Sequence, residues 1–466
     1  MGDATQDAAG SSTPRTPRVG ISGYWNMFRE GYDELVKAII RPPRAEYEIE
    51  ELGPTRFDFA GVSFEREDLQ LTNARGHALH CSMWRRQVAP EGGAPCVIYL
   101  HGNASCRAEA LQVISTVLAT GASLFALDLA ACGHSEGDYI SLGWYERDDV
   151  LAVIEHLRRE DNPHPTSTIA LWGRSMGAVS AVFQAARDPG IAGVVLDSPF
   201  ASLEQVALEL VTHAPEQVPN APSVPPFLVK AALRLVASTV KSRANFDLYK
   251  LRPVDAAATC YTPALFGTGS GDNMIRPHHS QQIYNAYKGD KNLVTFDGDH
   301  NDLRPSFFLD SASIFLKQCL MVPDHLQMDI PIDGQGRQVA SIRPVTGPSG
   351  RHSNMQVPMR DARDALEEAE EAMVRQAMLA SLATAAPPAA PPAAPPAGGA
   401  PAAAPPPVAD GAEPAVEASA AAPTSAPPAS AGGPPAAAPV DVTVDAADDE
   451  ESIMLAQAIQ LSLQER

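Results

Sequence analysis

The sequence is poor in several features that define whole classes of protein. Its six cysteines form no C-x-x-C pair, so neither a zinc ribbon nor a redox pair is expected. No apolar run is long enough to cross a membrane, and the first residues lack the apolar core of a signal peptide. These absences predict reduced thiols, no transmembrane segment, no metal or cofactor and a cytoplasmic location, with the nucleus as the alternative.

Positive charge is also scarce in this chain of 466 residues. Lysine and arginine number 35 against 56 aspartates and glutamates, which gives a net charge of −21. Nucleic acids and anionic membranes bind basic surfaces, so the balance argues against both as partners. Part of the acidity is local, in the runs at 367–371 and 448–451.

Between residues 56 and 320 short apolar runs alternate with longer amphipathic stretches. Near-continuous apolar strands between helices are typical of a mostly parallel sheet covered on both faces, so an α/β fold is expected. The expected inner strands are 96–100, 123–127, 168–172, 191–196, 264–266 and 292–296, and antiparallel edge strands are expected near 57–64 and 79–85. The expected helices are 108–119, 144–159, 176–186, 279–287 and 306–319.

The remaining segments differ from this pattern in composition. Within the 56–320 domain, residues 201–250 carry two apolar helical patterns divided by prolines, which predicts a helical cap over the carboxyl edge of the sheet. A peripheral helical pair with no gating role is the alternative. The other expected segments are a disordered 1–20, a helix and lead-in at 21–55, a linker at 321–363 and a disordered Pro/Ala-rich linker at 384–447.

The most informative motif is Gly173-Arg174-Ser175-Met176-Gly177, which directly follows an apolar strand pattern and opens a helical one. A serine on a sharp strand-to-helix turn needs small neighbours on both sides, because larger side chains collide there. The turn exposes the hydroxyl over the positive end of the helix. The pattern therefore predicts that Ser175 is a nucleophile.

Two further residues follow strands in the order that a Ser-Asp-His site requires. Asp272 comes after the strand at 264–266, and His300 comes after the strand at 292–296. We expect His300 to take the proton of Ser175 and Asp272 to orient the imidazole. Asp297, Asp299 and Asp302 are competitors for the acid, ranked lower because they lie so close to His300 in sequence.

An oxyanion hole is expected at two backbone N–H groups. One belongs to Met176, directly after the nucleophile, and the other to Asn103 in the loop after the strand at 96–100. His101 in the same loop is interpreted as a structural residue.

Together these residues resemble the α/β-hydrolase superfamily, close to its serine aminopeptidase-like and acylhydrolase-like branches. Residues 128–137 are similar to the family's D-x-x-G-x-G-x-S-x-G loop, although Ala131 stands where the first glycine is usual. The resemblance implies an α/β-hydrolase fold and hydrolysis of an ester, thioester or amide, with an acyl or peptide substrate and no metal.

The segments 364–383 and 448–466 resemble ubiquitin-interacting motifs. Each has an acidic run followed by apolar residues, alanine and serine at helical spacing, which implies ubiquitin or ubiquitinated proteins as partners. The residues expected to meet ubiquitin are Val374, Ala377, Met378, Ser381, Leu455, Ala458, Ile459 and Ser462. Helices that dock on the hydrolase or dimerise are the alternative.

The sequence therefore favours a serine hydrolase with a ubiquitin-binding tail. A ubiquitin-binding adaptor on an inactive hydrolase scaffold is the second hypothesis. Cleavage of the ubiquitin isopeptide bond is ranked low, because Cys106 and Cys132 lack a visible base.

Overall fold

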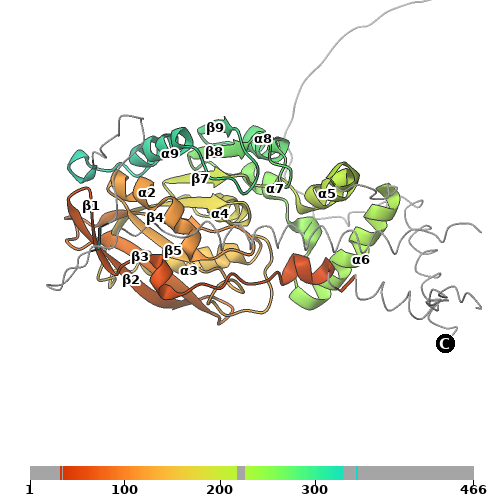
Figure 1. Cartoon of the computed structure of the whole chain (residues 1–466), viewed down its shortest axis with the longest axis horizontal. Helices are drawn as coiled ribbons and strands as arrows, with labels where there is room; N and C mark the ends of the chain where they lie inside the picture. The colour runs from red at the N-terminus through yellow and green to blue at the C-terminus, as the bar shows by residue number, and fades with distance from the viewer. Residues whose placement is uncertain (1–31, 34, 218–225, 329–342, 345–466) are drawn as a thin grey trace, which may run out of the picture. The chain divides into compact units, whose positions relative to one another are not determined.

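The structure, a computed structural model, describes residues 32–33, 35–217, 226–328 and 343–344 (Figure 1). Its strands are β1 Arg56–Phe59, β2 Val62–Thr72, β3 Ala78–Arg86, β4 Ala94–Leu100, β5 Ser123–Leu127, β6 Thr166–Arg174, β7 Gly193–Asp197, β8 Ala264–Gly269, β9 Lys291–Phe296 and β10 Arg343–Pro344. They form one sheet in the order β10-β1-β2-β3-β5-β4-β6-β7-β8-β9.

The larger part of this sheet is parallel. Strands β5, β4, β6, β7, β8 and β9 run in the same direction, whereas β1, β2 and β3 pair antiparallel and β3 joins the parallel part at β5. Every residue of β5, β7 and β8 is buried, as expected for strands covered on both faces. The predicted fold class and the antiparallel edge are confirmed.

Helices cover both faces of the sheet, as Figure 1 shows. The α-helices with defined bounds are α2 Ile114–Thr120, α3 Glu146–Leu157, α4 Met176–Arg187, α5 Leu203–Gln217, α6 Pro226–Ala244, α7 Pro253–Ala257, α8 Pro277–Ala286 and α9 Ser306–Cys319. The 3-10 helices are η1 Ile49–Leu52, η2 Arg107–Gln112, η3 Leu248–Lys250 and η4 Asp324–Leu326. Helices α2 and α9 pack together, and α3, α4, α7 and α8 form a second contiguous layer.

The two faces have separate apolar cores. Trp172 of β6 belongs to one core, together with Phe308 of α9. The preceding residue, Leu171, belongs to the other core, together with Ile154 of α3. Successive strand residues point to opposite faces, so one apolar run supplies both cores.

One predicted helix is divided. The expected helix at 108–119 consists of η2 followed by α2, with Val113 between them. Arg107 and Glu109 in η2 are buried. The backbone N–H of Arg107 donates to Asp128, and the Glu109 carboxylate accepts the Tyr99 hydroxyl, contacts that the amphipathic pattern does not indicate.

The insertion between β7 and β8 is helical, as predicted, and contains α5, α6 and η3. The N-terminal helix was expected at the outside of the domain, and its described residues pack on this insertion. Val36 and Ile40 are buried against Val236 and Val240 of α6, and the Tyr32 hydroxyl donates to the Leu235 carbonyl at 2.9 Å.

The folded body continues beyond residue 320, because Val322, Leu326 and Met328 are buried. β10 pairs with β1 inside the segment interpreted as a linker. The expected disordered segments, the rest of that linker and both ubiquitin-interacting motifs lie outside the described residues.

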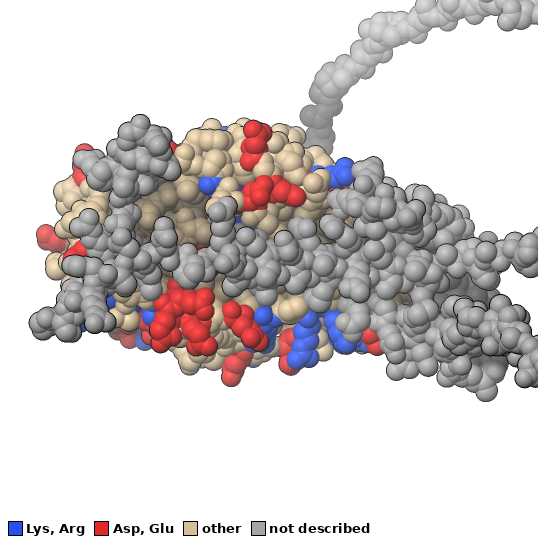
Figure 2. Space-filling view, in the orientation of Figure 1, with Lys and Arg blue, Asp and Glu red and all other residues tan. Residues whose placement is uncertain are grey.

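Two surface properties bear on possible partners. Within the described ranges, no helix combines the length and apolar character needed to cross a bilayer. On the face in Figure 2, acidic and basic side chains of the described residues alternate in small groups, without a continuous basic surface.

Two adjacent phenylalanines of α9 test the packing of this fold. Phe308 is fully buried, with its ring centroid 6.3 Å from that of Trp172 and 5.3 Å from that of Phe296, whereas Phe307 is 51% exposed. We expect Phe308→Ala to lower the free energy of unfolding by about 3–5 kcal/mol. Phe307→Ala is the matched control and should change it by less than about 1 kcal/mol. Equal losses in denaturant titrations of the two variants would contradict this packing.

Candidate active site

The turn between β6 and α4 has the strained shape that the G-x-S-x-G pattern predicts. Ser175 has φ 50° and ψ −114°, a backbone conformation that costs an L-residue about 1–3 kcal/mol. A Cβ atom at Gly173 would overlap the backbone of Gly177, and a Cβ at Gly177 would overlap the carbonyl oxygen of Leu100. Only glycine fits at either position, so the motif's spacing follows from backbone contacts.

Three of the residues singled out in the sequence come together at this turn. The Oγ of Ser175 lies 3.1 Å from Nε2 of His300, and Nδ1 of His300 lies 2.7 Å from Oδ2 of Asp272. The residues come from three separate loops, which follow β6, β8 and β9. The distances are those of an unbroken hydrogen-bond chain from hydroxyl to imidazole to carboxylate.

Asp272 is held by its other oxygen. Its Oδ1 accepts the backbone N–H groups of Met274 at 3.1 Å and Ile275 at 2.7 Å, and its side chain is fully buried. A buried carboxylate needs such partners to offset its lost hydration. Because Oδ1 is fixed by the loop, Oδ2 is aimed at His300.

The competing aspartates have other partners. Asp299 accepts the backbone N–H groups of His300 at 2.7 Å and Asn273 at 3.0 Å, and Asp302 accepts that of Asp299 at 2.6 Å. Asp297 accepts the hydroxyl of Ser270 at 3.1 Å. These carboxylates shape the loop and do not contact the imidazole among the hydrogen bonds of the described residues.

The predicted oxyanion loop lies beside Ser175. Asn103 follows β4, and a Cβ built on the adjacent Gly102 would lie 3.9 Å from Cβ of Ser175. Met176 is the first residue of α4, where backbone N–H groups are free of helical partners. The use of the Asn103 and Met176 N–H groups as oxyanion donors stays a prediction.

His101 is buried within the same loop. Its Nδ1 lies 2.7 Å from the carbonyl of Gly102, which can only accept, and its Nε2 therefore accepts the N–H of Leu129 at 3.1 Å. Both ring nitrogens are used in shaping the loop, which favours the structural interpretation of His101.

The loop after β5 resembles the family motif and is held by buried acids. Asp128 accepts the N–H groups of Arg107 at 2.7 Å and His134 at 3.0 Å, and the hydroxyl of Tyr47 at 2.7 Å. Ala131 has φ 66°, in the left-handed region where the family usually has glycine. Alanine therefore adopts here a conformation that glycine adopts more easily.

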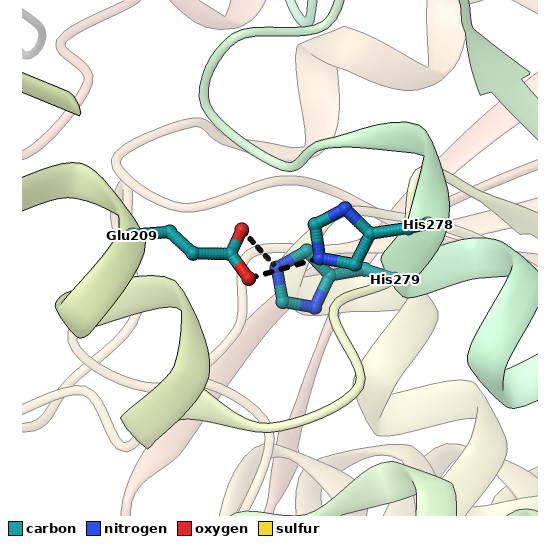
Figure 3. Close-up of side chains that lie close together, drawn as sticks. All are labelled: Glu209, His278 and His279. Atoms are coloured by element: carbon teal, nitrogen blue, oxygen red, sulfur yellow. Dashed lines mark hydrogen bonds and ion pairs between the residues drawn. The ribbon is translucent and has the colours of Figure 1, made fainter. Parts of the chain in front are cut away.

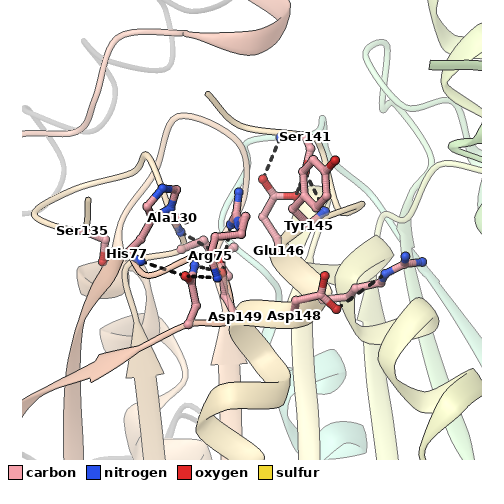
Figure 4. A network of polar contacts seen from close by, with 12 residues as sticks. Arg75, His77, Ala130, Ser135, Ser141, Tyr145, Glu146, Asp148 and Asp149 are labelled. Carbon is pink, nitrogen blue, oxygen red and sulfur yellow. Dashed lines mark hydrogen bonds and ion pairs between the residues drawn. The ribbon is translucent and has the colours of Figure 1, made fainter. Parts of the chain in front are cut away.

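A second acidic network supports this loop from α3 (Figure 4). Asp149 accepts the N–H of Ala130 at 2.9 Å and pairs with Arg75 at 3.0 Å, and burial raises the pKa of Asp149 to about 6. Glu146 accepts from the backbone and hydroxyl of Ser141 at 2.7 and 2.6 Å. Sequence analysis missed both residues, since they read only as acids in the first turn of an expected helix.

One cluster in the described part of the chain could hold a metal ion. Glu209 of α5 faces His278 and His279 of α8, with Nε2 of the two histidines 2.9 and 3.3 Å from its oxygens (Figure 3). However, Nδ1 of His279 accepts the N–H of Ala201 at 3.3 Å, which leaves the ring proton on Nε2. A metal would need the lone pair at that Nε2. The cluster therefore fits a hydrogen-bonded contact between the insertion and α8 better than a ligand set.

The cysteines do not offer an alternative nucleophile. All six are free thiols, and burial raises the pKa of Cys106 to about 12 and that of Cys132 well above its ordinary value. A thiol becomes nucleophilic as a thiolate, and burial suppresses that form.

Comparisons with known proteins found similarity to hydrolases. A serine aminopeptidase family (S33) matches residues 94–250. An α/β-hydrolase domain-containing protein of Arabidopsis thaliana is 26% identical over 220 residues, which cover 47% of this chain and 65% of that protein. Human monoglyceride lipase is 30% identical over 140 residues, 29% of this chain and 45% of that protein. An esterase from Pyrococcus furiosus superposes with a TM-score of 0.44 at 22% identity, covering 60% of this chain and 99% of that one.

The turn predicts unequal tolerance of two glycines. Gly177→Ala places a methyl group against the fixed Leu100 carbonyl, so we expect a loss of about 1–3 kcal/mol or more in unfolding free energy. At Gly190 the nearest atom is the mobile end of the Arg158 side chain, so Gly190→Ala should be nearly neutral. Thermal or chemical denaturation measures both, and an undisturbed Gly177→Ala variant would refute the contact.

Proposed function

We propose that this chain, which has the α/β-hydrolase fold, is a serine hydrolase that cleaves an acyl ester or thioester through a covalent intermediate on Ser175. The observation that carries the proposal is the hydrogen-bond chain from Ser175 through His300 to Asp272. A serine hydroxyl is a weak nucleophile until a base takes its proton, and the base needs an orienting acid.

The first half-reaction acylates the enzyme. Nε2 of His300 takes the hydroxyl proton as Oγ of Ser175 attacks the acyl carbonyl, and a tetrahedral oxyanion forms. The backbone N–H groups of Asn103 and Met176 are the proposed donors to that oxyanion. When the intermediate collapses, His300 gives its proton to the leaving alkoxide or thiolate, which departs and leaves an acyl-serine.

Water completes the cycle. His300 takes a proton from a water molecule, whose oxygen attacks the acyl-serine carbonyl. Collapse of the second tetrahedral intermediate returns the proton to Oγ of Ser175 and releases the carboxylic acid. Asp272 keeps its charge throughout and stabilises the imidazolium that forms twice.

Acyl esters and thioesters are the proposed substrates, and amides rank behind them. Monoglyceride lipase, named for an ester substrate, is among the matched relatives. A thiol or alcohol also leaves more readily than an amine.

The six unpaired cysteines support a location in the reducing cytoplasm.

A fluorophosphonate probe tests the nucleophile. We expect the purified full chain to be labelled and Ser175→Ala to lose labelling by about a thousandfold or more, because the probe bonds to the activated oxygen. Ser311→Ala, on α9 and away from the site, is the control for loss of any hydroxyl and should label normally. No labelling of folded wild-type protein would favour the alternative, an adaptor on an inactive scaffold.

The leaving group is identified by a panel of p-nitrophenyl esters, acyl thioesters and aminoacyl amides. Turnover of esters or thioesters that disappears in Ser175→Ala supports the proposal. Turnover of the amides alone would instead assign a peptidase.

We further propose that the tail binds ubiquitin through its two acidic helical motifs. The support is the repeated pattern in the sequence, with Ala377 and Ser381 in the first copy matching Ala458 and Ser462 in the second. Short isolated helices bind weakly, and two copies on one chain gain affinity through avidity.

Ubiquitin binding is measured by titrating isotope-labelled ubiquitin with the full chain. We expect Ala377→Gln combined with Ala458→Gln to weaken binding by about tenfold or more, since a bulky side chain on the contact face blocks close approach. Gln376→Ala combined with Gln457→Ala changes the opposite face of each expected helix and serves as control. Equal binding by both double variants would remove the proposed contact face.

A further inference from the structure

The residue directly before the nucleophile is a buried arginine. Arg174 ends β6, and its side chain is 7% exposed. In the G-x-S-x-G pattern this position is variable, so sequence analysis assigned it no role. Its guanidinium group has partners in two different segments, η2 and the loop after β9.

The first partner is Glu109 of η2, which supports the oxyanion loop. Nη1 of Arg174 lies 3.4 Å from Oε2 of Glu109, whose side chain is almost completely buried. The Glu109 carboxylate also accepts the hydroxyl of Tyr99 at 2.8 Å and the N–H of Gly102 at 3.3 Å. Gly102 directly precedes Asn103, the proposed oxyanion donor. Glu109 therefore fixes the backbone from which that donor projects.

The second partner is the loop that carries the histidine. Nη2 of Arg174 donates to the carbonyl of His300 at 3.1 Å and to Oδ1 of Asn301 at 2.8 Å. One planar guanidinium group thus contacts the histidine loop directly and the oxyanion loop through Glu109, a geometry that the single ammonium of lysine does not reproduce.

A second arginine offers a comparison. Arg304 donates to the same His300 carbonyl at 2.9 Å and pairs with Asp197 at the end of β7 at 2.7 Å. Its other contacts in the described part of the chain are with the Asp302 carbonyl and the Phe296 ring, and none is with the oxyanion loop. Arg304 therefore holds only the histidine loop, whereas Arg174 links the histidine loop to the oxyanion loop through Glu109.

We infer that Arg174 and Glu109 form a positioning pair that sets the oxyanion donor and the His300 imidazole in register with Ser175. The inference rests on the proposed serine hydrolase chemistry. Neither residue touches the reacting atoms, so each acts through the loop that it holds. Attack by Ser175 and binding of the oxyanion require the His300 imidazole and the oxyanion donor to be in position at the same time. Loosening the pair therefore slows the chemical step more than it weakens substrate binding.

The kinetic test uses Arg174→Lys, Glu109→Gln and the double variant, with the ester found in the panel. We expect each single variant to lower kcat by about tenfold or more, with KM changed by less than about threefold. The double variant should lose no more than the worse single variant, because the two residues act as one unit. Arg304→Lys combined with Glu109→Gln should instead show additive losses. Arg158→Lys, in a surface ion pair with Asp188, is the control.

Hydrogen–deuterium exchange supplies a readout that does not need turnover. In Arg174→Lys we expect faster amide exchange at both 101–106 and 299–304, whereas Arg304→Lys should affect only 299–304. Amide exchange in the strands of the sheet that is as slow as in the wild type shows that the variants are folded.

The outcomes separate the two proposals. If wild-type protein labels at Ser175 and Arg174→Lys keeps full kcat, or if its faster exchange is confined to one loop, the positioning pair is overturned. If wild-type protein is not labelled, the serine hydrolase proposal fails. The exchange experiment then still decides whether Arg174 joins the two loops.

Discussion

The candidate site depends on one close contact between backbones. The first turn of α4 packs directly on the end of β4, so closely that a single methyl group at Gly177 would overlap the Leu100 carbonyl oxygen. This contact places Ser175, at the end of β6, beside the loop that follows the neighbouring strand β4. The left-handed conformation of Ser175 follows, because the chain must reverse sharply to start a helix there. The surrounding sheet supplies the packing energy that holds this strained turn.

Much of the site could be predicted because it is local in sequence. The glycine spacing predicts the turn. Asp272 and His300 each follow a strand, which predicts that both lie at the same edge of a parallel sheet. The apolar runs also indicated the inner strands, since strands buried on both faces have near-continuous apolar sequences. These signals depend on a few neighbouring residues and on the repeat of secondary structure, so a single sequence contains them.

The supporting residues could not be predicted in this way. Glu109, Glu146 and Asp149 look like ordinary acids of helical segments, but their carboxylates accept hydrogen bonds from groups 5 to 76 residues away in the chain. Arg174 sits at a position where the motif permits any residue. Burying a charge requires a partner, and the identity of that partner depends on the tertiary fold. The composition of the chain and the spacing of its residues do not identify that partner.

The packing of the N-terminal helix has a mechanical consequence for the helical insertion between β7 and β8. Val36 and Ile40 pack against α6. The Ile40 carbonyl also accepts the N–H of Ile140, in the loop after β5, at 2.9 Å. Asp33 adds an ion pair with Arg243 at 2.7 Å. The insertion is therefore anchored by a segment about two hundred residues upstream as well as by its own ends. Any hinge motion of α6 must therefore break these contacts or move residues 32–40 with it, so the N-terminal segment and the insertion are mechanically coupled.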